Sequence, residues 1–405
     1  MTHFIPYSRQ LIDEDDIKAV SEVLRSDFIT QGPKISEFED ALASYCGAGH
    51  AVVFSSGTAA LHAAYFSGGL DSRNELITSP ITFAATSNAS LFLGAIPVFV
   101  DIEKDTGNID TGKIEEHISD KTKMIVPVHY SGHPAHLKEL HKLAMKHNIL
   151  VVEDACHALG SKYQGLRIGD GTYSSMTVFS FHPVKQITTG EGGAVLTNSK
   201  EFYEKLMLFR THGITKEHFS HEPDGGWYYE MQHLGYNYRM TDIQAALGRS
   251  QLKKLGNFVE KRREVARIYG EAFHDNPYFD TPVEKDYAFS SYHLYPIRLK
   301  DGYVQKKREI FSKLKEYGIG AQVHYIPVYL HPYYQGKGYS KGLCPSAEDF
   351  YKKTISIPIY PAMSDKDVRY VVEKILSIFD DQILSVSASK AENLVSEEIQ
   401  YESKN

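Results

Sequence analysis

Seven short apolar runs between residues 51 and 198 constrain the fold of this chain more than any other feature of its sequence. Most are continuous Val, Ile and Phe runs rather than alternating ones, which is typical of strands buried on both faces. Helical stretches at about 58–66, 111–118, 135–147 and 199–210 fall between them. The pattern predicts an α/β fold whose central, mostly parallel sheet is covered by helices. The runs are AVVFS (51–55), ELITS (75–79), IPVFVD (96–101), KMIVPVH (123–129), ILVVEDA (149–155), SMTVFSF (175–181) and GAVLTN (193–198).

The rest of the chain predicts further helices and a second, smaller unit. An amphipathic pattern over 13–25 places Ile17, Val20, Val23 and Leu24 on one side. The pattern breaks near 213–236 and is helical again over 238–273. Strands near 292–299 and 320–326, with helices near 302–317, 346–353 and 365–380, predict a smaller α+β domain. We expect four parts: an N-terminal helix and loop (1–35), a large domain (36–255), a small C-terminal domain (256–385) and a disordered tail (386–405).

Composition narrows the classes of protein that the chain can belong to. The net charge of −7 argues against an extended polyanion-binding surface, so we expect no nucleic-acid partner. The three cysteines, Cys46, Cys156 and Cys344, are far apart and have neither disulfide nor metal-site spacing, which favours a reducing cytoplasm. The N-terminus lacks the pattern of a signal peptide, and no run of 18 apolar residues occurs, so we expect no membrane span.

Several common catalytic motifs are absent from the sequence. There is no GxGxxG after a strand, no GxxxxGK[ST], no HExxH and no GxSxG. His133, His136 and His141 match no common metal-site spacing, and we interpret them as part of a solvated helix with polar turns. We therefore expect no metal.

Polar residues of useful chemistry follow three of the apolar runs. Because the carboxyl ends of parallel strands meet at one edge of an open sheet, where ligands bind, we expect these residues to lie together. A helix start that suits a phosphate, a carboxylate and a lysine are what a pyridoxal 5'-phosphate site needs. The residues are Ser55, Ser56, Gly57 and Thr58 after the first run, Asp154 and His157 after the fifth, and Ser180, His182 and Lys185 after the sixth.

Each of these residues also has a plainer interpretation. Free N–H groups at Gly57 and Thr58 would attract a phosphate, but Ser56 could simply cap the helix. Asp154 could pair with a protonated pyridine nitrogen, or cap the next turn. Burial would lower the pKa of Lys185 and make its amine a nucleophile, whereas most lysines lie on the surface. The Gly-Gly pair that follows Lys185 argues against a surface lysine, because small residues let the backbone approach a bulky ligand.

Four stretches resemble the DegT/DnrJ-type sugar-nucleotide aminotransferases, which are pyridoxal 5'-phosphate enzymes of the aspartate aminotransferase fold (fold type I). They are SSGTAAL (55–61), EDACHALGS (153–161), SFHPVKQITTGEGGAVLTN (180–198) and LGYNYRMTDIQAALG (234–248). The resemblance covers about residues 5–380 and makes 36–255 the cofactor-binding domain. It also implies a homodimer with shared active sites. The stretches ITQG, SPITFAATSNA, DTGNID and GAQVHYIPVY narrow it to enzymes of pseudaminic acid synthesis, which use a UDP-linked 4-keto-6-deoxy-N-acetylhexosamine and L-glutamate.

The resemblance implies a role for individual residues of this chain. Lys185 corresponds to the catalytic Schiff-base lysine and Asp154 to the partner of the pyridine nitrogen. Phe83 stands where an aromatic residue stacks on the ring, although core packing is the alternative. His157 stands near the cofactor hydroxyl, although it could be a satisfied core histidine. The implied cofactor contacts are Ser56, Gly57, Thr58, Phe83, Asp154, His157, Ser180, Lys185 and, reaching the phosphate of the neighbouring subunit, Asn237.

The resemblance also implies contacts with the sugar nucleotide. They are Tyr7, Asp27, Phe28, Ile29, Thr30, Gln322, Val323, His324 and Tyr325. Asp27 is unfavourable beside an anionic diphosphate, and if it turns to solvent only backbone and Thr30 would serve. Family members that act on other nucleotide sugars at the 3- or 4-position remain alternatives, as does a sugar dehydratase. In the dehydratases a histidine replaces the lysine, so Lys185 favours transamination.

Overall fold

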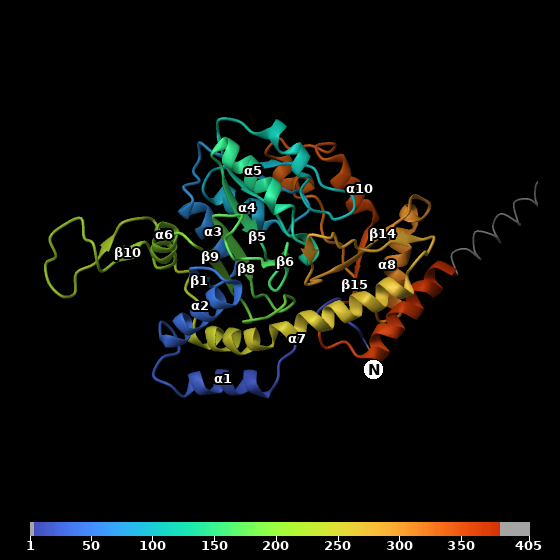
Figure 1. Cartoon of the computed structure of the whole chain (residues 1–405), viewed down its shortest axis with the longest axis horizontal. Coiled ribbons are helices and arrows are strands. Elements are labelled where there is room, and N and C mark those ends of the chain that lie inside the picture. Colours follow the sequence, from blue (N-terminus) through green and yellow to red (C-terminus); the bar gives the residue numbers. More distant parts are fainter. Residues whose placement is uncertain (1–3, 381–405) are drawn as a thin grey trace, which may run out of the picture.

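The computed structural model describes residues 4–380, and its centre is a seven-stranded sheet (Figure 1). The strand order is β1-β9-β8-β5-β4-β2-β3. All neighbours are parallel except β9, which is antiparallel to both β1 and β8. All seven apolar runs form strands of this sheet, so the predicted mostly parallel α/β architecture is confirmed. The strands are β1 (His50–Phe54), β2 (Glu75–Thr78), β3 (Ile96–Phe99), β4 (Thr122–Val126), β5 (Leu150–Asp154), β8 (Met176–Ser180) and β9 (Gly193–Thr197).

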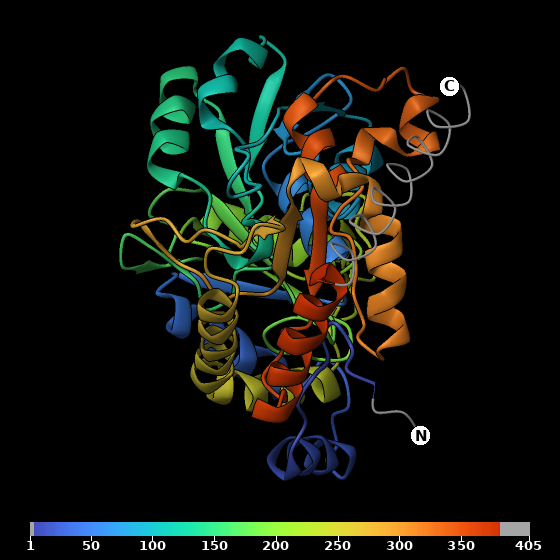
Figure 2. The same ribbon diagram turned by 90° about the vertical axis from the view of Figure 1, so that its right-hand side faces the viewer.

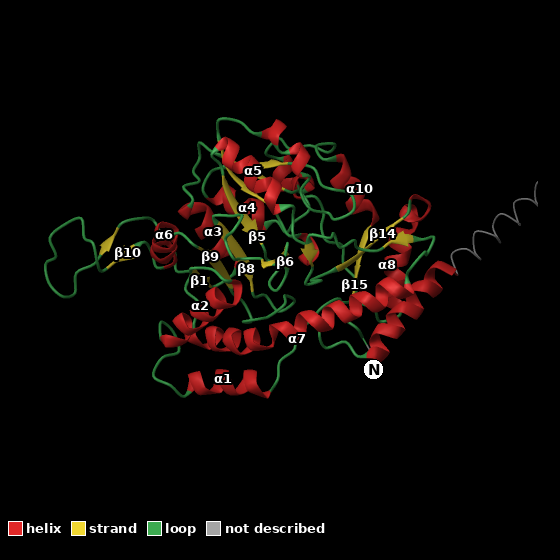
Figure 3. Cartoon of the chain, in the orientation of Figure 1, coloured by secondary structure: helices red, strands yellow, loops and turns green. Residues whose placement is uncertain are grey.

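Helices cover both faces of the sheet, as the continuous apolar strands require (Figures 1 and 3). Successive residues of a strand point to opposite faces, so Val53 of β1 lies in one apolar core and Val52 in the other. The Val53 core takes in α2 (Pro33–Cys46), α5 (Leu137–His147) and the first half of α7 (Asp242–Ala272). The Val52 core takes in α3 (Gly57–Ser67), α4 (Ala85–Phe92) and α6 (Lys200–Arg210).

A further apolar core lies around a three-stranded antiparallel sheet. It also contains the second half of α7 and the helical run 365–380. The predicted strand near 320–326 is wrong, since only Gln322 forms a bridge, with Ser356. The segment 111–118 forms two 3₁₀ turns instead of one helix. The elements of this core are β12 (Phe279–Asp280), β14 (Tyr295–Leu299), α8 (Lys307–Glu316) and β15 (Thr354–Ile357). The helices α9 (Pro332–Gln335) and α10 (Pro345–Lys353) pack in another core, which includes Phe99 of β3.

Helix α7 is shared by these two cores and runs beneath both parts of the chain (Figure 1), so that the view in Figure 2 shows it nearly end-on. It begins with a capping box, in which the Thr241 side chain accepts from the Gln244 N–H and the Gln244 side chain accepts in return. Leu255 belongs to the core on the seven-stranded sheet, and Tyr269 belongs to the core around β14. One continuous helix therefore joins the two parts of the chain.

Helix α1 (Glu14–Leu24) forms where the sequence predicts it, but it buries only part of the expected face. Ile17 and Leu24 are 50% and 60% exposed. The helix instead packs on α7 through Val23 and the fully buried Asp16, whose carboxylate accepts a 2.6 Å hydrogen bond from Gln251. The hydrogen bond between Gln251 and Asp16 thus replaces part of the apolar contact that the periodicity of α1 predicts.

Residues 213–236, hereafter the arm, project from the body of the molecule (Figure 1). Within it β10 (Ile214–Thr215) pairs antiparallel with β11 (Glu230–Met231). Outside the arm, three further short strands form a separate sheet: β6 (Lys162–Tyr163), β7 (Leu166–Arg167) and β13 (Ala288–Phe289). Large apolar side chains of the arm are exposed, namely Trp227, Tyr229, Met231, Leu234 and Tyr236.

Three sequence interpretations remain, on His133, on the C-terminal tail and on membrane spans, and the first of them is wrong. His133 does not lie on a solvated helix: it precedes α5, is buried, and accepts a hydrogen bond from the Lys285 N–H. The predicted tail 386–405 lies outside the described residues. Within residues 4–380, no helix is long and apolar enough to cross a membrane.

Candidate active site

The start of α3 forms a polar recess beside the carboxyl end of β8. The Ser56 side chain caps the helix by accepting from the Ala59 N–H at 3.1 Å. The N–H groups of Gly57 and Thr58 have no acceptor among residues 4–380. Free N–H groups at the positive end of an 11-residue helix suit a phosphate. A Cβ at Gly57 would lie 2.9 Å from the Ser180 Cβ, so the close approach requires glycine.

The antiparallel strand β9 holds this recess together. Gly193 pairs with Ser180 of β8 on one side and with Phe54 of β1 on the other. A Cβ at Gly193 would lie only 2.6 Å from the Ser56 carbonyl oxygen. The last glycine of the TTGEGG stretch, Gly193, therefore lets the start of α3 pack directly on the sheet.

Asp154 ends β5 and is 4% exposed. One carboxylate oxygen accepts from the Cys156 N–H at 3.1 Å, and the other accepts from the Thr86 hydroxyl at 2.6 Å. No lysine, arginine or histidine in the described part of the chain forms an ion pair with it. Both interpretations of Asp154 thus find support, because it caps the next turn and still has lone pairs for a cationic N–H donor.

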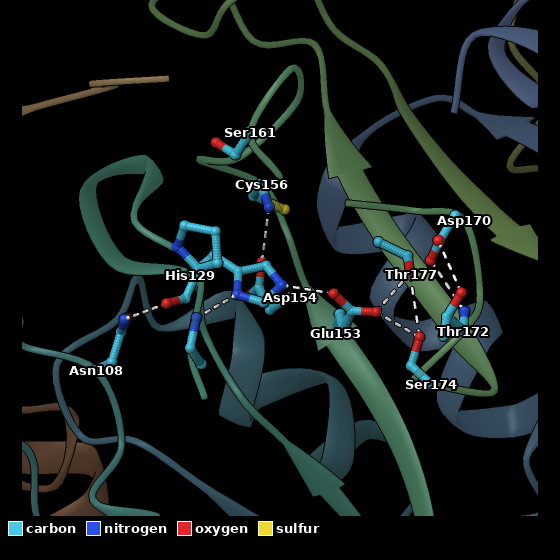
Figure 4. A network of polar contacts seen from close by, with 12 residues as sticks. Asn108, His129, Glu153, Asp154, Cys156, Ser161, Asp170, Thr172, Ser174 and Thr177 are labelled. Atoms are coloured by element: carbon cyan, nitrogen blue, oxygen red, sulfur yellow. Dashed lines mark hydrogen bonds and ion pairs between the residues drawn. The ribbon is translucent and has the colours of Figure 1, made fainter. Parts of the chain in front are cut away.

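The strand that carries Asp154 is fixed from its other face by the network in Figure 4. Buried Glu153 accepts from His129 Nε2 at 2.6 Å and from the Thr177 hydroxyl at 3.1 Å. His129 Nδ1 accepts from the Ala135 N–H at 3.0 Å, so the ring proton is on Nε2 and is donated to Glu153. This network connects β5 to β8 and to the loop after β4, and so holds Asp154 in place.

Lys185 lies in the loop after β8, where its N–H donates to the His182 carbonyl at 2.9 Å. Burial lowers the pKa of its amine, Cys156 and Asp154 act in the opposite direction, and the Arg262 cation lowers the pKa further. Lys185 is therefore not an ordinary surface lysine. A lowered pKa increases the fraction of free amine, which is the nucleophilic form.

Three histidines near Lys185 are held in their neutral form. Burial lowers the pKa of His157 and of His293 well below the usual range, and lowers that of His324 to about 3. The charge on Lys185 adds to the effect at all three. At neutral pH these rings act as neutral hydrogen-bonding groups and add no positive charge to the site.

His157 lies within a chain of polar contacts that ends at Tyr325. The Ser131 N–H approaches His157 Nδ1 at 3.4 Å, and His157 Nε2 lies 3.0 Å from the Tyr325 hydroxyl. His157 is thus buried and satisfied, and it also reaches the Lys185 region. Phe83 is 63% exposed, with its ring centroid 6.4 Å from that of Tyr325, so it is not packed in the core.

The substrate residues predicted at 322–325 lie beside the N-terminal segment. The rings of Tyr7 and His324 are 5.4 Å apart, and the Tyr7 carbonyl accepts from the Ile359 N–H at 3.1 Å. Tyr130 donates to the His324 carbonyl at 2.7 Å. Val323 is half-buried next to His324, whereas Gln322 is exposed. The structure thus brings Tyr7, His324 and Tyr325 together with His157.

The remaining predicted residues lie elsewhere, at the start of α7. Residues 27–30 are exposed, and Thr30 forms a bridge with Thr241. No hydrogen bond or ring contact within residues 4–380 joins this loop, Asp27 included, to Lys185. Asn237 is also exposed, and its side chain forms no hydrogen bond in the described part of the chain. Asn237 forms a bridge with Thr211 and is followed by Tyr238, whose carbonyl accepts from the Ser55 N–H at 2.8 Å, so its backbone lies near the phosphate recess.

Sequence reasoning missed three residues of this site. Thr86 lies in the SPITFAATSNA stretch, but nothing in that stretch indicates that its hydroxyl reaches Asp154. His293, whose ring centroid is 4.3 Å from that of His157, follows a long gap in sequence and has no signal. Arg262 does have a signal in the sequence, because it interrupts an apolar stripe of α7.

The residues present fit pyridoxal 5'-phosphate. The free N–H groups at the start of α3 suit its phosphate, and Gly57 and Gly193 let this helix start pack closely on the ends of β8 and β9. The buried Asp154 carboxylate suits its ring nitrogen, and the Lys185 amine suits its aldehyde. No group of three or more metal-ligating side chains occurs among residues 4–380.

Comparisons with known proteins agree with this geometry. The model of the DegT/DnrJ/EryC1/StrS aminotransferase family matches residues 10–376. The chain is 43% identical over 379 residues to the UDP-4-amino-4,6-dideoxy-N-acetyl-beta-L-altrosamine transaminase of Campylobacter jejuni, a match that covers 93% of this chain and 98% of that protein.

Two solved structures are also similar. Helicobacter pylori PseC, an aminotransferase involved in the biosynthesis of pseudoaminic acid, superposes with a TM-score of 0.87 and 41% identity, covering 94% of this chain and 100% of that one. The PLP-form of the putative sugar aminotransferase Spr1654 from Streptococcus pneumoniae has a TM-score of 0.88 and 30% identity, covering 94% of this chain and 99% of that one.

Proposed function

Since the chain belongs to the DegT/DnrJ/EryC1/StrS aminotransferase family and is a pyridoxal-5'-phosphate-dependent aminotransferase of fold type I, we propose that it makes a 4-amino sugar nucleotide of the pseudaminic acid pathway. The amino group of L-glutamate is transferred to the keto carbon of a UDP-linked 4-keto-6-deoxy-N-acetylhexosamine. The observation that carries this proposal is the 43% identity, over nearly the full length of both proteins, to a UDP-4-amino-4,6-dideoxy-N-acetyl-beta-L-altrosamine transaminase.

The chain offers one set of residues to hold the cofactor. Gly57, Thr58 and Ser180 would bind the phosphate, with Ser56 fixing the helix start. Asp154 would pair with the ring nitrogen. The remaining contacts would come from Phe83 against the ring, His157 near the ring hydroxyl and Lys185 at the aldehyde.

The bound cofactor supplies an aldehyde and an electron-withdrawing ring, which let an amino group leave one carbon and join another. Lys185 supplies the proton transfers. Its neutral amine takes the proton from the Cα of glutamate in the first half of the reaction. In the second half it delivers a proton to the sugar carbon that gains the amino group. The first step needs the neutral amine and the second needs the ammonium that the first step produces, so an amine whose pKa is lowered can take part in both.

The reaction also requires that the sugar nucleotide is bound with its ketone in the correct position. We propose that Tyr7, loop 27–30 and residues 322–325 bind it, so that the remote UDP portion places the ketone beside Lys185. The neutral His157 and Tyr325 then act as hydrogen-bonding groups that do not compete with Lys185 for a proton.

We further propose that the enzyme is a homodimer in which Asn237 completes the phosphate site of its neighbour. Two observations support this arrangement. The Asn237 side chain has no hydrogen-bond partner within the described chain, although its neighbour Tyr238 accepts from the Ser55 N–H at 2.8 Å, beside the phosphate recess. The arm that precedes Asn237 exposes several large apolar side chains, Trp227 by 75% and Leu234 by 74%.

The alternative within the same family is a 3- or 4-aminotransferase for another nucleotide sugar. A sugar dehydratase is less consistent with the chain, because Lys185 stands where the dehydratases have histidine. All of these enzymes would share the cofactor site and would differ in the sugar pocket.

The test is an incubation of the purified protein with UDP-linked 4-keto-6-deoxy-N-acetylhexosamine and L-glutamate. We expect equal amounts of 4-amino sugar nucleotide and 2-oxoglutarate, detected by mass spectrometry. The Lys185→Ala variant is the control and should form neither. Turnover of a dTDP- or GDP-linked ketone but not of the UDP-linked one would refute the substrate, and a deoxygenated product without 2-oxoglutarate would indicate a dehydratase.

A further inference from the structure

Arg262 is a buried cation that the proposed reaction leaves without a role. It is fully buried, and no carboxylate in residues 4–380 forms an ion pair with it. Burying a charge is costly unless its donors are bonded, so the position needs an explanation. Burial lowers the pKa of its guanidinium to about 9, which still leaves Arg262 charged at neutral pH.

Arg262 stands at the junction of the two cores that α7 joins. The apolar stripe of this helix runs through Phe258 and Val259 in the core on the seven-stranded sheet, and continues through Val265 and Ala266 in the core around β14. With the 3.6-residue period of a helix, Arg262 occupies the next place on the same stripe. An apolar side chain would fill this position on the stripe, so packing alone does not explain why an arginine stands there.

The donors of Arg262 bind backbone carbonyls from three separate segments. Nη1 donates to the Ile359 carbonyl at 2.7 Å and to the His293 and Tyr292 carbonyls at 3.3 and 3.4 Å. Nη2 approaches the Val184 carbonyl at 3.4 Å. Val184 directly precedes Lys185, so one side chain connects the lysine loop to the segments around β14 and β15.

A second donor reaches the same carbonyl from the N-terminal segment. The buried Ser8 hydroxyl donates to the Val184 carbonyl at 3.1 Å. Ser8 is adjacent to Tyr7 in sequence, so the residues next to the predicted substrate contacts and to Lys185 are joined through one acceptor.

We infer that Arg262 is a positioning residue for Lys185: it fixes the lysine loop through Val184, and its positive charge, which no carboxylate pairs, disfavours the ammonium form of the lysine. The lowered pKa of Lys185, to which Arg262 contributes, supports the second part. The inference uses the aminotransferase assignment but not the identity of the sugar. The titratable and charged groups that act on Lys185 are Asp154, Cys156, His157, His293, His324 and Arg262.

The test measures attachment of pyridoxal 5'-phosphate to the full-length apoenzyme, so it needs no sugar substrate. The rate is followed by cofactor absorbance across a range of pH, and mass spectrometry after borohydride reduction locates the attachment at Lys185. Removing the cation in Arg262→Met should stabilise the ammonium form of Lys185. We expect the pH profile to move to higher pH, and attachment at pH 7 to slow about tenfold.

Two further variants separate charge from position. Arg262→Lys keeps the cation but cannot serve four carbonyls, so we expect an unchanged midpoint and a lower maximal rate. Arg263→Met is the matched control: Arg263 is the next residue, but its guanidinium pairs with Glu284 at 2.6 Å. We expect this control to keep both the midpoint and the maximal rate.

The inference is overturned if Arg262→Met keeps the wild-type pH profile, or if Arg262→Lys moves the midpoint as far as Arg262→Met does. Thermal unfolding of each variant shows whether it folds. If Arg262→Met does not fold, Arg262→Lys and Ser8→Ala test the positioning role instead. Ser8→Ala removes an uncharged donor to the Val184 carbonyl, so it should lower the maximal rate of attachment and leave the midpoint of the pH profile unchanged. Wild-type attachment in both variants would exclude positioning by Arg262.

Discussion

At the scale of single residues, the site depends on polar side chains whose partners lie far away in sequence. Asp154 and Lys185 could be predicted, because each follows an apolar run directly and the carboxyl ends of parallel strands meet. Thr86 could not, because its hydroxyl reaches Asp154 only through the tertiary fold. Arg262 is visible in the sequence as an interruption of the apolar stripe of α7, but its partners are not. Sequence patterns thus identify the charged groups of such a site better than the groups that orient them.

The Thr86 hydroxyl is one of two donors to the Asp154 carboxylate. In Thr86→Val the carboxylate loses this donor, which is worth about 1.5–3 kcal/mol for a hydrogen bond to a charged group. We expect weaker binding of pyridoxal 5'-phosphate by about tenfold, measured as Kd by absorbance titration. Thr78→Val is the control, since Thr78 is also buried but donates to the Val126 carbonyl. Equal affinities in the two variants would show that Thr86 does not orient Asp154.

At the scale of elements, the strands were predicted more accurately than their surroundings. Each run was long and continuous enough to specify a strand buried on both faces. In the segment 320–326 only Gln322 pairs, with Ser356 on the outer edge of β15, so the segment adds one bridge to that sheet and no strand. The face of α1 was wrong because Asp16, a residue that a periodicity count treats as exposed, is bonded to Gln251 and buried.

The packing of α3 on the end of β8 leads to a second prediction. In Gly57→Ala the new Cβ would lie 2.9 Å from the Ser180 Cβ, so the helix start or the strand end must move. Overpacking of this kind costs about 1–3 kcal/mol. We expect a Kd for pyridoxal 5'-phosphate, and for free phosphate as a competitor, that is raised about tenfold.

The matched control is a glycine in the interior of α7. Gly270 has nothing within 4 Å of the position where a Cβ would be placed. Gly270→Ala should therefore stabilise the protein by about 0.5–1 kcal/mol through helix propensity, seen as a higher Tm, without a change in cofactor affinity. A Gly57→Ala protein with wild-type affinity would mean that the start of α3 is not the phosphate site.

At the scale of the whole molecule, the role proposed for Asn237 depends on a second copy of the chain. The Asn237 side chain is exposed and has no hydrogen-bond partner among residues 4–380. A resemblance could suggest this arrangement, but no pattern of apolar or polar residues specifies which surface another subunit covers. The domain boundaries at 35, 255 and 385 likewise stay predictions.

Complementation between inactive variants tests the shared site. Lys185→Ala and Asn237→Ala are each expected to be inactive or nearly so. If Asn237 acts in the neighbouring subunit, a mixed dimer has one intact site of two, and random exchange of equal amounts should restore about a quarter of wild-type activity. The activity is measured as release of 2-oxoglutarate after mixing, and no recovery in a mixture shown to exchange subunits would place Asn237 in its own subunit's site.

The arm provides an independent test of the dimer. Leu234→Asp puts a charge on a side chain that is 74% exposed in the single chain. If a second copy covers the arm, the variant should be monomeric at concentrations where the wild type is dimeric, as measured by analytical ultracentrifugation. Lys216→Asp is the control, because Lys216 is exposed at the base of the same arm and carries no apolar surface. Dissociation of both variants, or of neither, would contradict a specific role for the apolar face.

The continuity of α7 limits how this enzyme can move. A helix of 31 residues is about 46 Å long, and it has no proline or kink at the place where it leaves one core for the other. A bending point at that junction would break backbone hydrogen bonds and separate Arg262 from its four carbonyls. The two cores therefore keep a fixed spacing and direction along this helix, and movement during the reaction is confined to segments outside it.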